Sequence, residues 1–366
     1  MRIGIIGAGQ LGRMLALAGY PLGLSCTFLD PNADACGAQV GECIVGAYDD
    51  PVKLHELAKA TDVLSFEFEN VPVTTLAAVT KRKPLYPPLA ALAASQDRLT
   101  EKTLFRQLDI ATPEFRAVDS LADLQQAVAD IGLPGIVKTR RLGYDGRGQY
   151  RLRTAKDVLA AWQELGSVPL IYEAFVPFTR EVSIIGVRSS KGEIAIYPLT
   201  ENIHQQGVLH LSTAPYKNTK LQSQAEKHLK KLLKHFNYVG VLTIEFFVLR
   251  GQLVANEMAP RVHNSGHWTI EGAETSQFEN HLRAICGLPL GSTAARGQVA
   301  MLNFVGHIPE RATVLQQPGI HFHHYGKQTR PGRKLGHATL VARTRTARDL
   351  ALKKLLILLP KNKTKA

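Results

Sequence analysis

The sequence predicts an α/β protein that begins with a parallel-sheet domain and ends in a small, mostly β domain. Two observations support this prediction. In residues 1–93, short apolar strands such as "RIGIIG", "SCTFLD" and "VLSFEFE" alternate with helical patterns, which is typical of a parallel sheet covered by helices. After residue 95, helices are mixed with hairpins, and strands such as "GQVAMLNFVG" precede a closing helix. We therefore expect three domains, at residues 1–94, 95–290 and 291–366.

Composition excludes some classes of protein. The chain has 366 residues, 45% of them hydrophobic and 20% charged, which is ordinary for a globular protein. No apolar run approaches the roughly 20 residues that cross a bilayer, and the glycine-rich start "MRIGIIGAG" does not resemble a signal peptide. The four cysteines form no C-x-x-C pair. We therefore expect reduced thiols in a cytoplasmic protein without a membrane partner.

The formal net charge of +13 points to an anionic partner. A nucleic acid is one alternative, but nucleic-acid binding favours a basic stripe together with a recognisable module. The excess of Lys and Arg is instead spread along the chain, apart from the tail "LPKNKTKA". We therefore expect small anionic substrates and no nucleic-acid partner.

The first candidate site is "GAGQLG" at residues 7–12, a complete G-x-G-x-x-G. It lies between a predicted strand at 2–6 and a predicted helix at 10–19, and the next predicted strand leads to Asp30, 18 positions after Gly12. An acidic residue at about this distance binds the ribose in Rossmann-like dinucleotide domains. Taken alone, the segment predicts an NAD site.

A second glycine-rich segment, "GIVKTRRLGYDGRGQYRL" at residues 135–152, separates predicted strands at 136–139 and 149–152. Its glycines allow the loop to close over phosphates with backbone N–H groups, and Lys138 on the incoming strand can reach a phosphate as a point charge. An ordinary flexible hairpin explains the same pattern equally well. On the phosphate interpretation, residues of about 110–170 form a lid.

The segment "LIYEAFVPFTREVSI" at residues 170–184 combines the end of one predicted strand with the start of another. The backbone of Glu173 to Val176 can pair with the edge of an adenine while the apolar side chains cover the ring. Glu181 can accept hydrogen bonds from ribose hydroxyls, although a glutamate at a strand start is more often solvated. By itself this segment indicates a nucleotide site only weakly.

The strongest indication lies in "VLTIEFFVLRGQLVANEMAPR" at residues 241–261. Two predicted strands flank a three-residue loop at 250–252, and a hairpin centred on Gly251 places Glu245 directly opposite Glu257. Like charges at opposed positions are destabilising, and a carboxylate between "LTI" and "FFV" is costly to leave uncompensated. A shared Mg²⁺ removes both problems. A register slip that turns one glutamate to solvent is the alternative.

Two further groups of charges favour anion binding. Arg98 and Lys102 lie four residues apart on a helix predicted to begin near Ser95, so a nearby phosphate would relieve their repulsion, although a solvated helix face is the commoner explanation of such a pair. In "RVHN", the bidentate anion binder Arg261 lies beside the hydrogen-bonding His263. Together the lid, the lysine, the adenine hinge and the carboxylate pair describe an ATP site without a Walker motif.

At this point the chain resembles the ATP-grasp carboxylate–amine ligases, in particular the ATP-dependent carboxylases that act on 5-aminoimidazole ribonucleotide. The match extends over nearly the whole chain. It is carried by "GAGQLGRM", "FEFENVP", "QDRLTEK", "RRLGYDGRGQ", "NEMAPRVHNSGHWT" and "GKQTRPGRKLGH". The resemblance implies an ATP-grasp fold with an N-terminal Rossmann-like (pre-ATP-grasp) domain and a small C-terminal, mostly β domain.

The resemblance also implies a set of functional residues. For ATP these are Arg98, Lys138, Gly143, Tyr144, Asp145, Gly146, Arg147, Gly148, Gln149, Glu173, Ala174, Phe175, Val176, Glu181, His204, Asn256 and Glu257. For Mg²⁺ they are Glu245 and Glu257, and Ala259 stands where many ATP-grasp enzymes have an Asn. For the ribonucleotide and bicarbonate the catalytic residues are Tyr144, Asp145, Arg147, Arg261, His263 and Asn264. For the 5′-phosphate they are Lys327, Arg333 and Lys334.

The implied reaction carboxylates the exocyclic amine of 5-aminoimidazole ribonucleotide in purine biosynthesis. Bicarbonate attacks the γ-phosphorus of ATP to give carboxyphosphate and ADP, and the amine captures this anhydride or the CO₂ released from it. Positioning and neutralisation of phosphate charge supply the catalysis. The resemblance further implies a homodimer and a first domain that hosts no NAD.

Three alternatives remain open on the sequence alone. One is another ATP-grasp ligase, such as a formate-dependent glycinamide ribonucleotide transformylase or a biotin carboxylase. The others are an NAD-dependent dehydrogenase and a non-catalytic nucleotide-binding or nucleic-acid-binding module. The "GYDGRGQ" and "RPGRKLGH" segments favour the aminoimidazole carboxylase, and the presence of both Glu245 and Glu257 favours catalysis.

Overall fold

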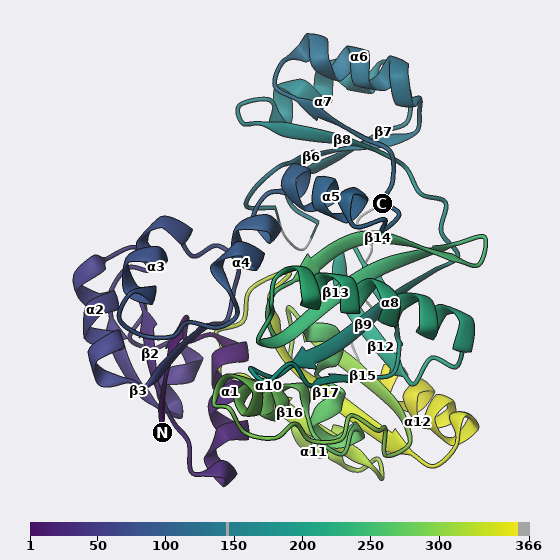
Figure 1. The fold of residues 1–366 in the computed structure, drawn as a ribbon. Helices are drawn as coiled ribbons and strands as arrows, with labels where there is room; N and C mark the ends of the chain where they lie inside the picture. Colours follow the sequence, from purple (N-terminus) through teal and green to yellow (C-terminus); the bar gives the residue numbers. More distant parts are fainter. Residues whose placement is uncertain (144–145, 358–366) are drawn as a thin grey trace.

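The described part of the chain folds into three β-sheets and the helices that cover them. The structure is a computed structural model that describes residues 1–143 and 146–357. Figure 1 shows the N-terminal sheet at the lower left, a small sheet at the top and the largest sheet at the lower right. All four cysteines lie in the described part and are free.

The N-terminal region is a four-stranded parallel sheet in the order β3-β2-β1-β4. Its strands are β1 (Arg2–Ile6), β2 (Ser25–Asp30), β3 (Glu42–Val45) and β4 (Val63–Phe66). Its helices are α1 (Gln10–Gly19), α2 (Pro51–Ala60), α3 (Val73–Thr80) and α4 (Leu89–Ser95). Every residue of β4 is buried, as expected for a parallel strand with helices on both faces of its sheet. The predicted Rossmann-like arrangement is confirmed.

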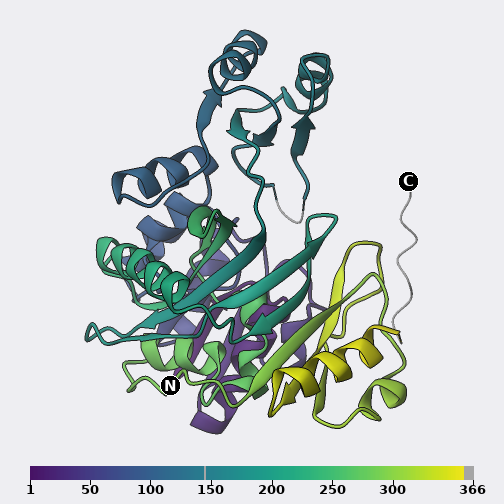
Figure 2. The ribbon, with the colours of Figure 1, turned by 90° about the vertical axis from the view of Figure 1, so that its right-hand side faces the viewer.

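The small sheet is antiparallel, in the order β5-β8-β6-β7. Its strands are β5 (Phe115–Val118), β6 (Gly135–Thr139), β7 (Gln149–Leu152) and β8 (Leu170–Ala174), and its helices are α6 (Leu121–Ile131) and α7 (Asp157–Leu165). Val137 and Tyr172 from the strands pack with Leu124 and Ala161 from the helices in one buried cluster. Figures 1 and 2 show that this unit projects from the rest of the molecule. It has its own core and contains the segment predicted to form a lid.

The largest sheet runs in the order β14-β13-β9-β11-β12-β15-β17-β16, with β10 paired to β9. Its strands are β9 (Arg180–Arg188), β10 (Ile194–Ile196), β11 (Thr200–Gln205), β12 (Val208–Ala214), β13 (Gly240–Leu249), β14 (Gln252–Ala259), β15 (Gln298–Val305), β16 (Ile320–His324) and β17 (Lys334–Ala342). The C-terminal strands thus continue the sheet begun by β9 to β14. Helix α12 (Arg345–Ile357) packs on β15 and β17.

Helices cover both faces of this sheet. Neighbouring residues of a strand point to opposite faces, and Ile184 and Ile185 of β9 accordingly lie in two different buried clusters. One cluster includes α8 (Thr219–His235) and the other includes α10 (Gln277–Ile285). The α10 cluster also contains side chains of β1, α1 and β2, so the N-terminal sheet is packed against the large sheet.

Helix α5 (Arg98–Gln107) begins at Arg98, and not near Ser95 as predicted. The Asp97 side chain caps it by accepting hydrogen bonds from the N–H groups of Leu99 and Thr100, at 2.9 and 3.2 Å, which is the usual role of Asp at this position. Ser95 instead ends α4. Helix α5 packs against β14, and this contact becomes important at the site.

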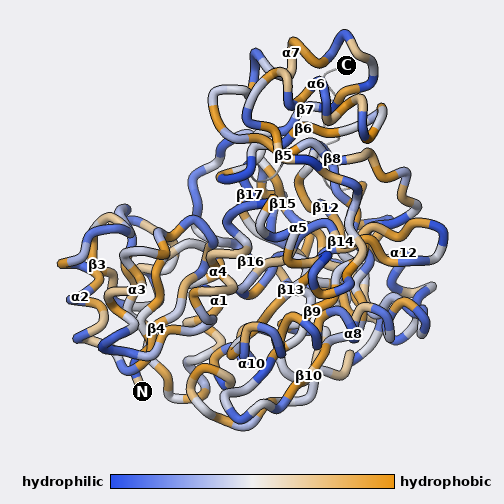
Figure 3. Tube along the Cα trace, turned by 45° about the horizontal axis from the view of Figure 1, so that its top comes forward, coloured by the Kyte–Doolittle hydropathy of each residue, from blue (hydrophilic) through white to orange (hydrophobic). Residues whose placement is uncertain are grey.

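Apolar residues are distributed over the whole trace in short stretches (Figure 3). Among the described residues, no helix has the length and apolar character that crossing a membrane requires. Separately, buried clusters of apolar residues lie between the sheets and the helices.

Candidate active site

The glycine-rich lid loop joins β6 to β7 within the small sheet and approaches the large sheet. Lys138 at the end of β6 pairs with Gln149 of β7, so the glycine-rich segment between them returns on itself. A Cβ atom at Gly146 would lie 3.1 Å from the carbonyl oxygen of Gln206, in the turn between β11 and β12. The loop therefore touches the edge of the large sheet. The predicted site residues that lie outside the described part are Tyr144 and Asp145.

Arg98 holds the base of the lid loop. Its guanidinium donates to the carbonyl oxygens of Thr139 and Gly143, both at 2.9 Å. The Thr139 N–H also donates to the carbonyl oxygen of Gly148, at 2.8 Å, and closes the neck of the loop. Arg98 is thus placed beside the segment predicted to cover the phosphates.

A buried ionic cluster lies below the lid. Glu173 is 2% exposed, and one of its oxygens lies 3.0 Å from Lys138 Nζ and 3.4 Å from Lys102 Nζ. Burial would raise the pKa of Glu173, but the two lysines hold it below its usual value. Glu173 thus already compensates Lys102, which is fully buried, and the expected relief of the Arg98–Lys102 repulsion by a phosphate stays a prediction.

The predicted adenine hinge follows β8. The N–H groups of Ala174 and Phe175 already donate to the carbonyl oxygens of Glu114 (2.8 Å) and Pro134 (3.1 Å). Within the described residues, the N–H of Val176 has no acceptor, although Val176 is buried. A buried amide without an acceptor is costly, so Val176 is the donor of this segment that remains for a base edge.

The β13–β14 hairpin places Glu245 opposite Glu257, but its loop length and its register differ from those predicted. The loop has two residues, Arg250 and Gly251, and both have positive φ (50° and 72°), as a tight primed hairpin turn requires. A β-bulge then shifts the register between Glu245 and Phe246, so that Glu245 pairs with Glu257. The predicted three-residue loop is wrong, and the predicted opposition of the two carboxylates is confirmed.

The two carboxylates form a site that fits a divalent cation. Burial is the main reason that the pKa of Glu245 rises to about 7, and the opposed charge of Glu257 raises it further. Glu245 is 12% exposed, whereas Glu257 is exposed. Mg²⁺ commonly uses one or two protein carboxylates and takes its other ligands from water and phosphates. The donor set and its uncompensated charge therefore suit Mg²⁺ beside a nucleotide.

Histidines surround this carboxylate pair. His204 Nδ1 lies 3.0 Å from a Glu181 oxygen; burial would lower the pKa of His204, but Glu181 and Glu245 raise it above its usual value. His263 Nε2 lies 3.4 Å from Glu245 Oε1. Burial and the nearby Arg261 hold the pKa of His263 well below its usual value, which disfavours the protonated ring.

The segment after β14 reaches toward the N-terminal region. Arg261 Nη2 lies 2.6 Å from Glu69 Oε1, and Glu69 follows strand β4. Asn264 and Asn303 of β15 hydrogen bond to each other through both of their amide groups, at 2.8 and 3.1 Å. The predicted anion binder Arg261 therefore already has a carboxylate partner, which an incoming anion would have to share or replace.

Three predicted 5′-phosphate residues meet at the edge of the N-terminal sheet. Lys327 Nζ donates to the side-chain oxygen of Gln10 at the start of α1. Burial lowers the pKa of Lys327, and the nearby cations Arg333 and Lys334 add to this effect. Arg333 also donates to the carbonyl oxygen of Gln328, at 3.2 Å. An anion bound among these cations would relieve their mutual repulsion.

The first glycine-rich loop is filled by the chain itself. The Gly9 and Gly12 N–H groups donate to the two carboxylate oxygens of Glu67, at 2.5 and 2.6 Å. Gly7 has a positive φ of 99°, and a Cβ atom there would overlap with Glu67 Cγ. In dinucleotide-binding domains these backbone groups face the pyrophosphate, whereas here an internal carboxylate takes that place.

Asp30, the residue spaced for a ribose, is also engaged internally. It is 7% exposed, and one oxygen accepts from the Ala8 N–H and the Tyr48 hydroxyl, both at 2.9 Å. The sequence pattern that alone predicts NAD is thus explained by two internal carboxylates that satisfy the loop.

The sequence analysis assigned no role to several residues that hold segments of the site in place. Glu67 and Glu69 lie in "FEFEN", which follows a strand next to β1 in a parallel sheet, and the carboxyl ends of such strands meet at one edge. That rule could have placed Glu67 beside the glycine loop. No local signal pointed to Glu101, whose carboxylate accepts from the Met258 N–H at 2.7 Å.

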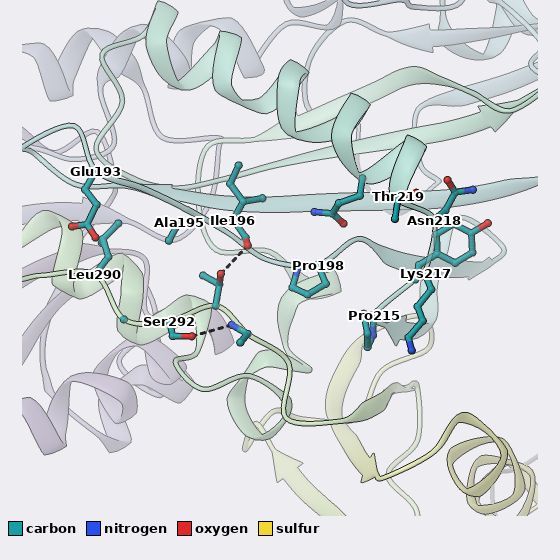
Figure 4. Close-up of a pocket in the computed structure, with 15 residues that line it drawn as sticks. Glu193, Ala195, Ile196, Pro198, Pro215, Lys217, Asn218, Thr219, Leu290 and Ser292 are labelled. Carbon is teal, nitrogen blue, oxygen red and sulfur yellow. Dashed lines mark hydrogen bonds between the residues drawn. The ribbon is translucent and has the colours of Figure 1, made fainter.

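A separate cavity of about 1020 Å³ lies away from these residues. Figure 4 shows it between β10, the N-terminus of α8 and the segment that includes Leu290 and Ser292. Of the described residues predicted to bind ATP, metal or ribonucleotide, none lines it. The chemistry predicted from the sequence therefore does not belong to this cavity.

Comparisons with known proteins match all three parts of the chain. Three family profiles match: the ATP-grasp domain at residues 103–278, the ribonucleotide synthetase preATP-grasp domain at 1–96 and the phosphoribosylaminoimidazole carboxylase C-terminal domain at 299–349. The chain is 56% identical to the N5-carboxyaminoimidazole ribonucleotide synthase of Pseudomonas aeruginosa over 340 residues, which cover 93% of this chain and 94% of that protein.

Solved structures agree with these matches. The N5-carboxyaminoimidazole ribonucleotide synthetase of Thermus thermophilus is 52% identical, with a TM-score of 0.94 and 99% of each chain covered. The N5-carboxyaminoimidazole synthase of Aspergillus clavatus, in complex with ADP and 5-aminoimidazole ribonucleotide, is 30% identical, with a TM-score of 0.90 and 98% of each chain covered. The whole chain therefore has the architecture of these enzymes.

Proposed function

The chain belongs to the family of N5-carboxyaminoimidazole ribonucleotide synthases, ATP-grasp ligases of purine biosynthesis, and from this membership we propose how its residues divide the reaction. The reaction is the ATP-dependent conversion of 5-aminoimidazole ribonucleotide to N5-carboxyaminoimidazole ribonucleotide. The observation that carries the assignment of residues is the pair of opposed carboxylates beneath a lysine-bearing lid.

ATP binds between the lid and the large sheet in this proposal. Lys138 and the glycine loop meet the phosphates, and Val176 offers its N–H to the adenine. Support comes from the position of Lys138 beside Glu173 and from the unpaired donor at the hinge. Because Glu173 is engaged with two lysines, its proposed part is to orient Lys138 rather than to pair with the base. Glu181, held by His204 at 3.0 Å, is the acceptor for ribose hydroxyls.

Mg²⁺ is held by Glu245 and Glu257, and when bound it neutralises charge on the phosphates of ATP. The fit rests on the opposed carboxylates and on the elevated pKa of Glu245, to which burial and Glu257 both contribute. Asn256, next to Glu257 on β14, lies at the same edge and is proposed to contact the nucleotide.

The ribonucleotide lies between the N-terminal sheet and the segment after β14. Lys327, Arg333 and Lys334 bind its 5′-phosphate, as the convergence of three cations supports. Arg261, His263 and Asn264 line the place of bicarbonate and of the amine. Tyr144, Asp145 and Arg147 complete this site from the lid, although the first two lie outside the described residues.

The chemistry requires no nucleophile from the protein. A bicarbonate oxygen attacks the γ-phosphorus of ATP, which breaks the bond to the β-phosphate oxygen and yields carboxyphosphate and ADP. The amine of the ribonucleotide then attacks the carboxyl carbon, phosphate leaves and the amine loses a proton. The released phosphate takes up that proton, and His263, whose Nε2 lies 3.4 Å from Glu245 Oε1, lines this part of the site. Exclusion of water by the lid protects carboxyphosphate.

The test is the formation of ADP from ATP, Mg²⁺ and bicarbonate, with and without 5-aminoimidazole ribonucleotide. We expect a strong stimulation by the ribonucleotide that also depends on bicarbonate. A stimulation that does not depend on bicarbonate would overturn the proposed carboxyl donor. Turnover that ignores the ribonucleotide but responds to another amine would overturn the proposed substrate site.

Two further properties are proposed, a homodimer from the family resemblance and a cytoplasmic location from the cysteine usage. We expect a homodimer, which light scattering coupled to gel filtration tests. We also expect a cytoplasmic location, in line with four free cysteines in the described part. A monomer at micromolar concentration would contradict the first expectation.

A further inference from the structure

The β-bulge in the hairpin decides on which face Glu257 lies. From the turn, pairs run regularly from Leu249–Gln252 to Phe246–Ala255, and the next pair is Glu245–Glu257. Asn256 is therefore the extra residue. In a regular ladder Asn256 would face Glu245, and Glu257 would point to the opposite face of the sheet, because side chains alternate along a strand. Bulges often re-aim a side chain next to a site.

Helix α5 makes two hydrogen bonds to the outer edge of β14 around the bulge, next to a third from the Ala255 N–H to the carbonyl oxygen of Ala111 at 2.7 Å. Within the described part of the chain, no strand pairs with this edge, because β14 is the last strand of its sheet. The Met258 N–H donates to Glu101 Oε1 at 2.7 Å, and Lys102 Nζ donates to the carbonyl oxygen of Asn256 at 2.9 Å. These two hydrogen bonds lie one residue on either side of Glu257. They come from neighbouring residues of one helix.

Both side chains are buried more deeply than their charges would favour. Glu101 is 3% exposed and Lys102 is 1% exposed, and isolated buried charges are strongly destabilising unless they are paired and hydrogen-bonded. Lys102 also lies 3.4 Å from Glu173, which contacts Lys138 at 3.0 Å. The same buried cluster thus connects the bulge to the lysine at the base of the lid.

We propose that Glu101 and Lys102 are positioning residues that hold the bulge and thereby aim Glu257 at the cation shared with Glu245. The proposal rests on the metal site proposed above. It assigns the role to two backbone contacts, so what matters at position 101 is an oxygen that accepts from the Met258 N–H. The negative charge at that position is not required.

The test measures binding of Mn²⁺, as a spectroscopic substitute for Mg²⁺, to the full chain in the presence of saturating ADP. Electron paramagnetic resonance reports the free ion. Glu101→Leu removes the acceptor, and we expect Mn²⁺ affinity to fall about 10- to 100-fold, as is usual when residues that orient metal ligands are changed. Glu101→Gln keeps an acceptor oxygen, and its Mn²⁺ affinity should stay within about 3-fold of the parent chain. Binding of ADP without metal should be unchanged in both variants.

The controls separate this proposal from the metal site itself. Glu257→Gln should lose Mn²⁺ binding; if it binds Mn²⁺ like the parent chain, the metal site is wrong. If Glu257→Gln loses binding while folded Glu101→Leu keeps the parent affinity, only the positioning role is overturned. Should Glu101→Leu fail to fold, Glu101→Gln still decides, because a 10-fold loss in that variant contradicts a role carried by the acceptor oxygen alone.

Discussion

The first glycine loop and the β13–β14 hairpin each hold a buried or half-buried carboxylate, but the chain treats them in opposite ways. Glu67 receives two backbone N–H groups at 2.5 and 2.6 Å and lies near Lys327. Glu245 receives an opposed carboxylate, Glu257, instead. The loop is therefore complete without a ligand, whereas in the hairpin burial and Glu257 raise the pKa of Glu245 to about 7, even though His204 and Lys334 act against this rise. An incomplete charge balance indicates a binding site more reliably than a glycine spacing does.

The glycines of the first loop serve its internal carboxylate. A Cβ atom at Gly9 would overlap with Glu67 Oε1, and one at Gly12 would lie 3.0 Å from the Gly7 carbonyl oxygen. A dinucleotide loop needs glycines for close approach to a pyrophosphate. Here the Glu67 side chain makes the same close approach. The glycine pattern can therefore leave room either for a pyrophosphate or for a side chain of the protein itself.

The largest effect should come from Glu257→Gln, which removes one of the opposed charges. We expect ADP formation to fall by about 100-fold, because a lost or displaced metal ligand weakens both metal binding and charge neutralisation. Without divalent cations the variant should unfold at the same temperature as the parent chain or a higher one, since the like-charge pair is gone. A coupled ADP assay and thermal unfolding in a chelator measure the two effects. Loss of activity together with a lower unfolding temperature in the chelator would contradict the comparison.

Glu67→Ala should behave in the opposite way, by lowering stability. It leaves the Gly9 and Gly12 N–H groups without their acceptors, which we expect to reduce the free energy of unfolding by about 2–3 kcal/mol. Urea unfolding of the parent chain and of the variant measures this difference. Glu67→Gln is the matched control, since its amide oxygen preserves one acceptor and should cost less. Equal stability of all three chains would mean that the loop does not depend on Glu67.

The stability of the contact between the N-terminal sheet and the large sheet should depend on pH through His281 of α10. His281 is buried, and its ring nitrogens contact the Ser65 hydroxyl of β4 at 3.1 Å and the Val241 N–H of β13 at 3.2 Å. Burial lowers the pKa of His281 to about 4, below its usual value of about 6.5. The unfolded chain therefore binds the proton more tightly, and stability is lost as pH falls from about 6.5 toward 4.

At pH 5 this loss should reach about 2 kcal/mol for His281 alone. Unfolding of the parent chain and of His281→Gln at pH 7 and pH 5 measures it, because the variant lacks the titrating group. The difference in stability between the two pH values should be smaller in the variant. An equal difference in both chains would assign the acid sensitivity to other groups.

The smallest effect should be the response to NADH. Because Glu67 and Asp30 already occupy the donors of the first loop, we expect no saturable change in nicotinamide fluorescence when the chain is added. MgADP, in contrast, should raise the unfolding temperature, since it binds only the folded chain. Saturable NADH binding that competes with 5-aminoimidazole ribonucleotide would contradict the view that the first glycine loop is complete without a ligand.

Much of the fold follows from local patterns. Alternating apolar strands and helices predicted the parallel N-terminal sheet, and the strands around the glycine-rich lid lie at Gly135–Thr139 and Gln149–Leu152. The opposition of Glu245 and Glu257 also followed from residues close together in the chain. Motif resemblance supplied the ATP-grasp family, which the comparisons confirm.

Other features could not be obtained from local patterns. The hairpin loop was predicted one residue too long, and the bulge that corrects the register was not foreseen. A bulge at Asn256 is stabilised by Lys102, which lies 154 positions earlier in the chain, so no signal near residue 256 announces it. The same holds for Lys102 of α5, whose charge is compensated by Glu173 of β8.

The sequence by itself therefore determined most of the elements and their order, and it predicted residues for ATP and a cation. Periodicity, turn residues and charge types are properties of contiguous stretches, and contiguous stretches can be interpreted without coordinates. Only the tertiary structure decided which carboxylates are already satisfied. Glu67 meets Gly9 across 58 positions and Glu101 meets Met258 across 157. Such pairs form because packing brings distant segments together, and their energy depends on burial and distance, which no local pattern contains.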